Sequence, residues 1–301
     1  FFALLQIVFM QETGALQRIV VWIKTFSHDD KPCQIMVINV VIGSMLVCVG
    51  ATPAIILPPI MFAMGYTTVI AIALPCIGYD SLCTFAMLGA AVVSLYNILA
   101  GLSPDQMALV GWTETPTLQQ CAIYFTNYLP VITPCICLSM LFMAGGAKLL
   151  KEGWLAAIIT GVCMGGFAFL FANFFEQSIV LMGVLCGACT LVIMLLYMKI
   201  RKIPYFNRDE LTEEDLALEK EIPLWKALTP WGLLIFFCVI TNFVGPLKDF
   251  LWSNPVMKMN VVLWPGDSGQ PMRVFWNAYF WVFVSTLLGA IVLKPRNGSS
   301  W

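Results

Sequence analysis

One long stretch of the chain, residues 35–101, contains no Lys, Arg, His or Glu, and its only acidic residue is Asp80. Soluble domains carry about 25% charged residues, so a stretch of this length and composition does not fit a soluble surface. The whole chain of 301 residues has the same character, with 60% hydrophobic and 11% charged residues. The composition predicts an all-α polytopic integral membrane protein, a multi-span helical bundle in a lipid bilayer, and argues against a nucleic-acid partner.

Charged loops separate the apolar runs, which reach the roughly 20 residues needed to cross a membrane. The chain starts inside an apolar run without an initiator Met, so we expect an internal fragment. We expect the end of a truncated span at 1–10, an amphipathic cytoplasmic or interfacial connector at 11–34, a broken-helix substrate region at 35–101, three spans within 121–198, a cytoplasmic linker at 199–226, spans at 227–244 and 274–293, and a truncated tail at 294–301. The three spans within 121–198 are expected near Cys121–Ala147, Trp154–Ala172 and Ile179–Met198.

Basic residues occur in alternate loops and indicate how the chain is oriented. They cluster at 18–31, 148–151 and 199–208, and they are absent from 103–120 and 173–178. By the positive-inside rule, the basic loops face the cytoplasm. An odd number of crossings must then lie between Lys31 and Ser103, from the first basic loop to the loop at 103–120 that has no basic residue. The uncharged stretch therefore holds either one span plus a re-entrant hairpin or three short spans.

The connector contains the segment "GALQRIVVWIKTF", which has the pattern of an amphipathic helix. Its apolar residues fall at helical spacing and lie opposite Gln17, Arg18 and Lys24; they are Leu16, Ile19, Val20 and Ile23. Such a helix either lies in the membrane interface or packs as an ordinary connector within the bundle. In the later linker, Thr212 precedes Asp215 by three residues, which predicts a helix cap at this point.

Helix-breaking residues recur in the uncharged stretch, first in "VGATPAIILPPIMF" and then around "LPCIG". In hydrocarbon, each unpaired backbone group costs several kcal/mol, so an interrupted helix is tolerated only where protein, water or ligand satisfies the freed groups. We expect broken or re-entrant helices near 50–59 and 75–81. The alternative is a kinked helix packed against its neighbours. The breaking residues are Gly50, Pro53, Pro58, Pro59, Pro75 and Gly78.

The broken region is also the predicted binding site. Every Lys and Arg lies in or beside a loop, so an anion inside the membrane would be held by helix N-termini and by hydroxyl groups. The expected substrate-binding residues are Ser44, Gly50, Ala51, Thr52, Ser81 and Thr84. An ionised acid inside the membrane is costly, so the pKa of Asp80 should rise, and this residue is the expected proton carrier. Alternatively, Asp80 caps a helix that starts at Ser81 near the interface.

Motifs of enzymes and cofactor sites do not fit this chain. His28 is the only histidine, which excludes histidine-based triads and zinc sites with several imidazoles within this sequence. The "CGAC" motif lies within an apolar run without a second cysteine pair, so we interpret Gly183 and Gly187 as a face for close helix packing, like Gly161 and Gly165. We expect no enzyme activity, metal or cofactor.

Several segments together resemble one family of transporters. They are "FMQETGALQRI", "GATPAIILPPIMFAMGY", "ALPCIGYDSLCTFAMLGAAVV", "LPVITPCICLSMLFMAGGAKLLKEGWLAAIITGVCMGGFAFLFANF" and "IPLWKALTPWGLLIFF". Their order is similar to that of the L-lactate permease family of bacterial proton-coupled symporters for lactate and related 2-hydroxy acids. In place of a glycine-rich family motif that includes a glutamate, this chain has "LVCVGATP", and it has Asp80 where the family tends to have an amide.

The resemblance implies a multi-pass protein of the bacterial inner membrane. Its expected function is secondary active transport, by proton-coupled symport, of a small monocarboxylate such as L-lactate or glycolate. The missing C-terminal half of the same chain would complete the transporter. The alternatives are a carrier of another organic anion, coupled to sodium, and a non-transporting membrane scaffold subunit. A polar, water-accessible cavity at the breaks would favour transport, whereas a packed apolar interior would favour a scaffold.

Overall fold

The computed structural model describes residues 2–25, 30–109, 111, 114–206, 211–253, 259–261, 270–272, 274–276 and 278–295, so His28 lies outside the described residues. These residues are almost entirely helical. The strands within the described part are β1 (Met259–Val261) and β2 (Gln270–Met272), which pair antiparallel as a small hairpin. The predicted helical membrane fold is confirmed, with this hairpin as an addition that the sequence did not predict.

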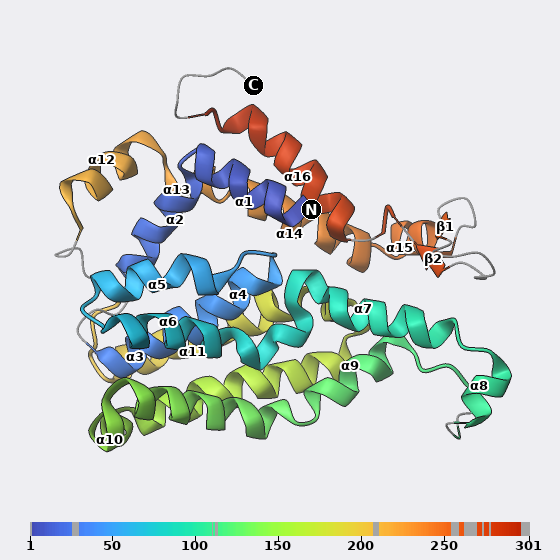
Figure 1. Ribbon diagram of the computed structural model, residues 1–301, viewed down its shortest axis with the longest axis horizontal. Coiled ribbons are helices and arrows are strands. Elements are labelled where there is room, and N and C mark those ends of the chain that lie inside the picture. Colours follow the sequence, from blue (N-terminus) through green and yellow to red (C-terminus); the bar gives the residue numbers. More distant parts are fainter. Residues whose placement is uncertain are drawn as a thin grey trace.

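The helices lie in two groups (Figure 1). The first group consists of α1 (Phe2–Glu12), α14 (Thr229–Phe243) and α16 (Ala278–Val292), which pack against one another. The short helices α13 (Leu224–Ala227) and α15 (Gly245–Ser253) flank α14. The connector α2 (Ala15–Lys24) contacts α1 of this group and α5 (Pro53–Ala63) of the other. It therefore bridges the two groups.

The second group contains the uncharged stretch and the long helices after it. Its elements are α3 (Lys31–Ile35), η1 (Met36–Ile42), α4 (Gly43–Cys48), α5, α6 (Thr68–Gly78), η2 (Tyr79–Phe85), α7 (Ala86–Ala100), α8 (Pro104–Leu109), α9 (Leu118–Thr126), α10 (Leu129–Phe174), η3 (Glu176–Leu181) and α11 (Met182–Ile200). In Figure 1, α10 lies along the side of this group that faces away from α1, α14 and α16.

Several helical runs are long and apolar enough to cross a membrane. In the part of the chain that the structure describes there are four, namely Lys31–Cys48, Thr68–Ala100, Leu129–Phe174 and Glu176–Ile200. A fifth is added if Thr229–Thr241 and Gly245–Leu251, which are bent by 85° relative to each other, form one span. The chain is thus a multi-pass helical membrane protein.

The longest helical run, α10, is a helical hairpin of two antiparallel arms. The chain reverses at Gly145 and Gly146, and Gly146 has φ 61° and ψ −156°, a conformation that is essentially restricted to glycine. The arms approach so closely that a Cβ on Gly161 would overlap the backbone of Pro134, and one on Gly165 would overlap that of Leu129. The predicted close packing at these two glycines is confirmed, and the hairpin covers two of the expected spans.

A second glycine pair brings α11 against the broken region. A Cβ on Gly183 would lie 2.7 Å from the Cβ of Cys48, and one on Gly187 would overlap the side chain of Met45. The interpretation of "CGAC" as a packing face is therefore confirmed. Larger side chains at these two positions would push α11 away from α4. The two glycines therefore hold α11 against the helix that ends at the first break.

The connector α2 is helical as predicted, but one of its residues lies on an unexpected side. We expected Arg18 on the polar face, whereas it is only 5% exposed. It is buried because the guanidinium pairs with Glu219 of the linker helix α12 (Glu213–Glu221), at 2.9 Å. The contacts of α2 fit the packed-connector alternative. The predicted cap of α12 is confirmed, since Thr212 and Asp215 form a capping box.

Candidate substrate site

The first break in the uncharged stretch lies between α4 and α5. The amide of Ala51 donates to the carbonyl of Leu46 at 2.9 Å, and that of Gly50 donates to Val47 at 3.1 Å. Together with the φ of 88° at Gly50, this is a Schellman motif, which ends a helix by satisfying its last carbonyls. The next helix starts at Pro53, directly after Thr52, which makes no side-chain cap.

The adjacent prolines Pro58 and Pro59 do not break the chain, because both lie inside α5. The break comes from Gly50 and from Pro53, which is well tolerated at the first position of a helix. With 11 residues, α5 is about 16 Å long, roughly half of a hydrocarbon core of about 30 Å. It packs against α6, so the two short helices form the type of hairpin expected for a re-entrant segment.

The second break begins at Tyr79 and extends beyond the predicted window. Pro75 lies inside α6, and the irregular part is the 3₁₀ segment η2 with the residues that follow it. Met87, Leu88 and Gly89 all have positive φ, at 49°, 59° and 71°. For Met87 and Leu88, which have a Cβ, this conformation costs free energy. The break therefore costs free energy that packing elsewhere must offset.

A third irregularity was not predicted. The segment η1 is a π-helix, a rare conformation that is frequent at functional sites. At its centre, the backbone of Asn39 lies against Gly78 of α6, where a Cβ would be 2.6 Å from the Asn39 carbonyl oxygen. The sequence signal for this segment was the polar amide side chain of Asn39 within an otherwise apolar run. Its close contact with Gly78 depends on the fold and could not be read from the sequence.

The irregular region holds buried polar atoms that have no hydrogen-bond partner among the described residues. They include Asn39 Oδ1, Ser44 Oγ and Ser81 Oγ, on residues that are 0%, 0% and 3% exposed. Their elements η1, α4 and η2 pack against one another. A buried polar group left unpaired costs about 1–3 kcal/mol, so such groups in native proteins are commonly reserved for a ligand or for water.

The expected site residues differ in their surroundings. Ser44 and Ser81 are buried, on two elements that pack together, and Gly50 and Ala51 are buried at the first break. Thr52 is exposed and Thr84 is half-buried. The interior at the breaks is thus polar but closely packed, so it matches neither the water-accessible cavity expected for a transporter nor the apolar interior expected for a scaffold.

Asp80 lies at the surface of this structure. The residue is exposed, in the first turn of η2, and the break between α6 and η2 has no side-chain cap. The alternative in which Asp80 caps a helix that starts at Ser81 therefore does not describe this segment. Asp80 follows Tyr79, whose Cβ would be 3.7 Å from a Cβ on Gly43 of α4, so the acid lies close in sequence to the packed interior.

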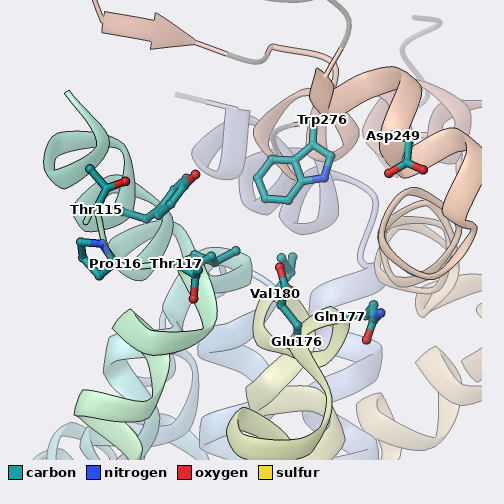
Figure 2. Close-up of a pocket in the computed structure, with 10 residues that line it drawn as sticks. Thr115, Pro116, Thr117, Glu176, Gln177, Val180, Asp249 and Trp276 are labelled. Carbon is teal, nitrogen blue, oxygen red and sulfur yellow. The ribbon is translucent and has the colours of Figure 1, made fainter. Parts of the chain in front are cut away.

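A cleft of about 370 Å³ lies elsewhere, where the two helix groups meet (Figure 2). Sequence analysis missed it because separate loops and helix ends form it. Its lining includes the carboxyl groups of Glu176 and Asp249, and none of the described residues that line it is basic. It contains none of the residues expected to bind the substrate. The other lining residues are Tyr96, Thr115, Pro116, Thr117, Leu118, Gln177, Val180 and Trp276.

Comparison with known proteins gives one result. The model of the L-lactate permease family matches residues 1–264, whereas no curated protein and no solved structure matches the chain. This is a family of transporters and not of enzymes, and its members handle a small organic anion in a lipid bilayer. The match covers most of the chain, including all three irregular segments. The chain therefore belongs to the L-lactate permease family.

Proposed function

We propose that this protein transports a small monocarboxylate, such as L-lactate, glycolate or a similar 2-hydroxy acid, together with protons across the bacterial inner membrane. Family membership supports the substrate class. The observation that carries the proposal is the pair of buried hydroxyls on Ser44 and Ser81, which have no partner and lie in a stretch without a basic residue. Hydroxyl donors can bind a carboxylate without the desolvation cost of a buried cation.

In this proposal, the substrate carboxylate accepts hydrogen bonds from Ser44 and Ser81. The N-terminus of α5, which directly follows Gly50–Thr52, supplies the positive end of a helix dipole. Thr52 and Thr84 are further hydroxyls along the two breaks. Because Thr52 is exposed and Ser44 is buried, substrate binding at both requires the first break to change conformation.

Asp80 carries the proton in this proposal. An ionised carboxyl next to Ser81 repels the substrate carboxylate, and a protonated one does not. Protonation of Asp80 therefore strengthens substrate binding, and by reciprocity the bound substrate favours protonation. This coupling is the feature that a symporter requires.

Uptake measurements test the proposal. The full-length protein in proteoliposomes with an imposed pH gradient should accumulate labelled lactate or glycolate, and a sodium gradient should not replace the pH gradient. Loss of one hydrogen bond to a charged group costs about 1.5–3 kcal/mol, so Ser44→Ala and Ser81→Ala should each lower uptake about 10- to 100-fold. Ser139→Ala is the control, since this exposed hydroxyl bonds to the carbonyl of Ile136.

The outcomes separate the parts of the proposal. No accumulation of either acid contradicts the substrate class. Uptake driven equally well by sodium contradicts proton coupling. If Asp80→Asn transports with an unchanged pH dependence, Asp80 is not the proton carrier, and the hydroxyl site stands without it.

A further inference from the structure

The side chain of Asn39 is held in one orientation. The residue is 0% exposed, and its Nδ2 donates to the carbonyl oxygen of Ile35 at 3.2 Å and contacts Met61 Sδ at 3.5 Å. Both partners are acceptors, so the amide nitrogen and not the oxygen must face them. Because Nδ2 faces these two acceptors, Oδ1 lies on the other side of the amide group, away from them.

The opposite atom of the same amide has no partner. Asn39 Oδ1 is buried and accepts no hydrogen bond. The backbone around it is fixed by the π-helix η1 and by the contact with Gly78. An acceptor held in this way is complementary to a group that carries a hydrogen. A carboxylate has only acceptor atoms, so Oδ1 would bind a hydroxyl and not a carboxylate.

Two unpaired donors lie near Asn39 in the fold. Ser44 follows Asn39 by five positions on the continuous η1–α4 run. Ser81 lies on η2, which packs against both η1 and α4. In a 2-hydroxy acid, the hydroxyl group is bonded to the carbon next to the carboxylate. Asn39 Oδ1 supplies one acceptor and the two serines supply hydroxyl donors, which is the set of groups that such a substrate requires.

We propose that Asn39 is a specificity-determining residue, whose Oδ1 accepts the hydrogen bond of the substrate 2-hydroxyl while Ser44 and Ser81 bind the carboxylate. This inference rests on the proposed function and adds the group that separates hydroxy acids from plain carboxylic acids. A site built around a substrate hydroxyl rejects the analogue that lacks it, because that analogue leaves a buried polar atom unpaired.

Competition between two acids of equal carbon skeleton tests this role. L-lactate and propionate differ only in the 2-hydroxyl, so their kcat/KM values are compared with the full-length protein in proteoliposomes. We expect the wild-type protein to prefer lactate by about 10- to 100-fold. Asn39→Leu, of similar size and without an acceptor, should lower lactate uptake and preserve or raise propionate uptake, so that the ratio falls towards one. Asn39→Ser, a smaller polar variant, should give an intermediate ratio.

The matched control is Thr160→Val. Thr160 is also 0% exposed, but its hydroxyl donates to Ala156 O at 2.8 Å and lies 3.1 Å from Met194 Sδ, so its removal should leave the lactate-to-propionate ratio unchanged. A ratio is insensitive to the amount of folded protein. An Asn39→Leu protein with the wild-type ratio overturns the inference. Equal uptake of both acids by the wild type also overturns it, even if no variant folds, whereas no uptake of any monocarboxylate overturns the proposed function instead.

Discussion

Two regions of this protein bury polar side chains in opposite ways. At the contact between α2 and α12, Arg18 donates from its guanidinium to Glu219 at 2.9 Å and to the carbonyl of Ile222 at 3.0 Å. Between η1, α4 and η2, the hydroxyls of Ser44 and Ser81 have no partner. The first region buries a full charge and pairs it, whereas the second buries neutral groups that have no hydrogen-bond partner among the described residues.

From this difference we interpret the first region as structural and the second as the proposed binding site. A buried charge is tolerated only when it is paired, so the pairs of Arg18 hold the linker helix on the connector between the two helix groups. A neutral hydroxyl costs less to leave unpaired, and it keeps its hydrogen bond for a ligand. Lys24 and Asp215, at 3.0 Å, form a second, half-buried pair in the first region.

The largest effect on stability should come from breaking the paired region. Arg18→Met removes an ion pair and the bond to the Ile222 carbonyl, and it should destabilise the fold by about 2–4 kcal/mol. Thermal unfolding in detergent measures this change, and a double-mutant cycle with Glu219→Gln isolates the pair. The control is Lys220→Met on the exposed side of α12, with an expected change within about 0.5 kcal/mol. Equal midpoints for Arg18→Met and the wild type would contradict the structural role.

The open region should respond in the opposite direction. Ser44→Ala and Ser81→Ala each remove a buried hydroxyl that pairs with nothing, so the unliganded fold should keep its stability or gain about 1 kcal/mol. Thr160→Val removes a paired hydroxyl and should instead lose about 1 kcal/mol. Unfolding midpoints of the three variants, measured without substrate, make the comparison. A clear loss of stability in both serine variants would show that these hydroxyls are structural.

The smallest effect concerns the pair of Lys24 and Asp215 and depends on pH. Burial alone would raise the pKa of Asp215, but hydrogen bonds from Lys24 and from the Thr212 amide outweigh it and hold the pKa below its ordinary value of 3.8. A carboxyl with a lowered folded-state pKa adds stability above its unfolded pKa, and this stability is lost as the pH falls through the folded value.

We therefore expect the stability of the wild type and of Lys24→Met to differ by less than about 1 kcal/mol at neutral pH. The two unfolding curves should converge as the pH falls from about 4 through the lowered folded-state pKa of Asp215, below which this carboxyl is protonated in both states. Unfolding midpoints measured between neutral pH and pH 3 test this. A difference that grows on acidification would contradict the sign of the pKa shift.

Local signals in the sequence predicted much of the fold. Apolar length gave the helical runs, and the glycine pairs at 161–165 and 183–187 gave the close contacts of α10 and α11, because helix packing at such pairs depends mainly on the missing side chain. The first break was predicted within its window. Its position at Gly50, and not at Pro58 and Pro59, depends on a backbone turn that only glycine adopts readily.

Long-range contacts explain what the sequence could not predict. Arg18 was assigned to the polar face because its partner Glu219 lies 201 residues later in the chain. The π-helix at Asn39 has the same local composition as an α-helix, and the contact of its backbone with Gly78 exists only in the folded protein. The candidate site was therefore located by its break, but its unpaired acceptor emerged only from the structure.

The distance in sequence between Arg18 and Glu219 also sets an order of events during biosynthesis. At about 5–20 residues per second, a ribosome needs roughly 10–40 s to make the intervening chain. During this time the arginine of α2 has no counterion from α12, so it must stay hydrated at the membrane surface. The connector can settle between the two helix groups only after the linker has emerged. Docking of α12 is thus a late assembly step, which follows synthesis of the segments that carry the candidate substrate site.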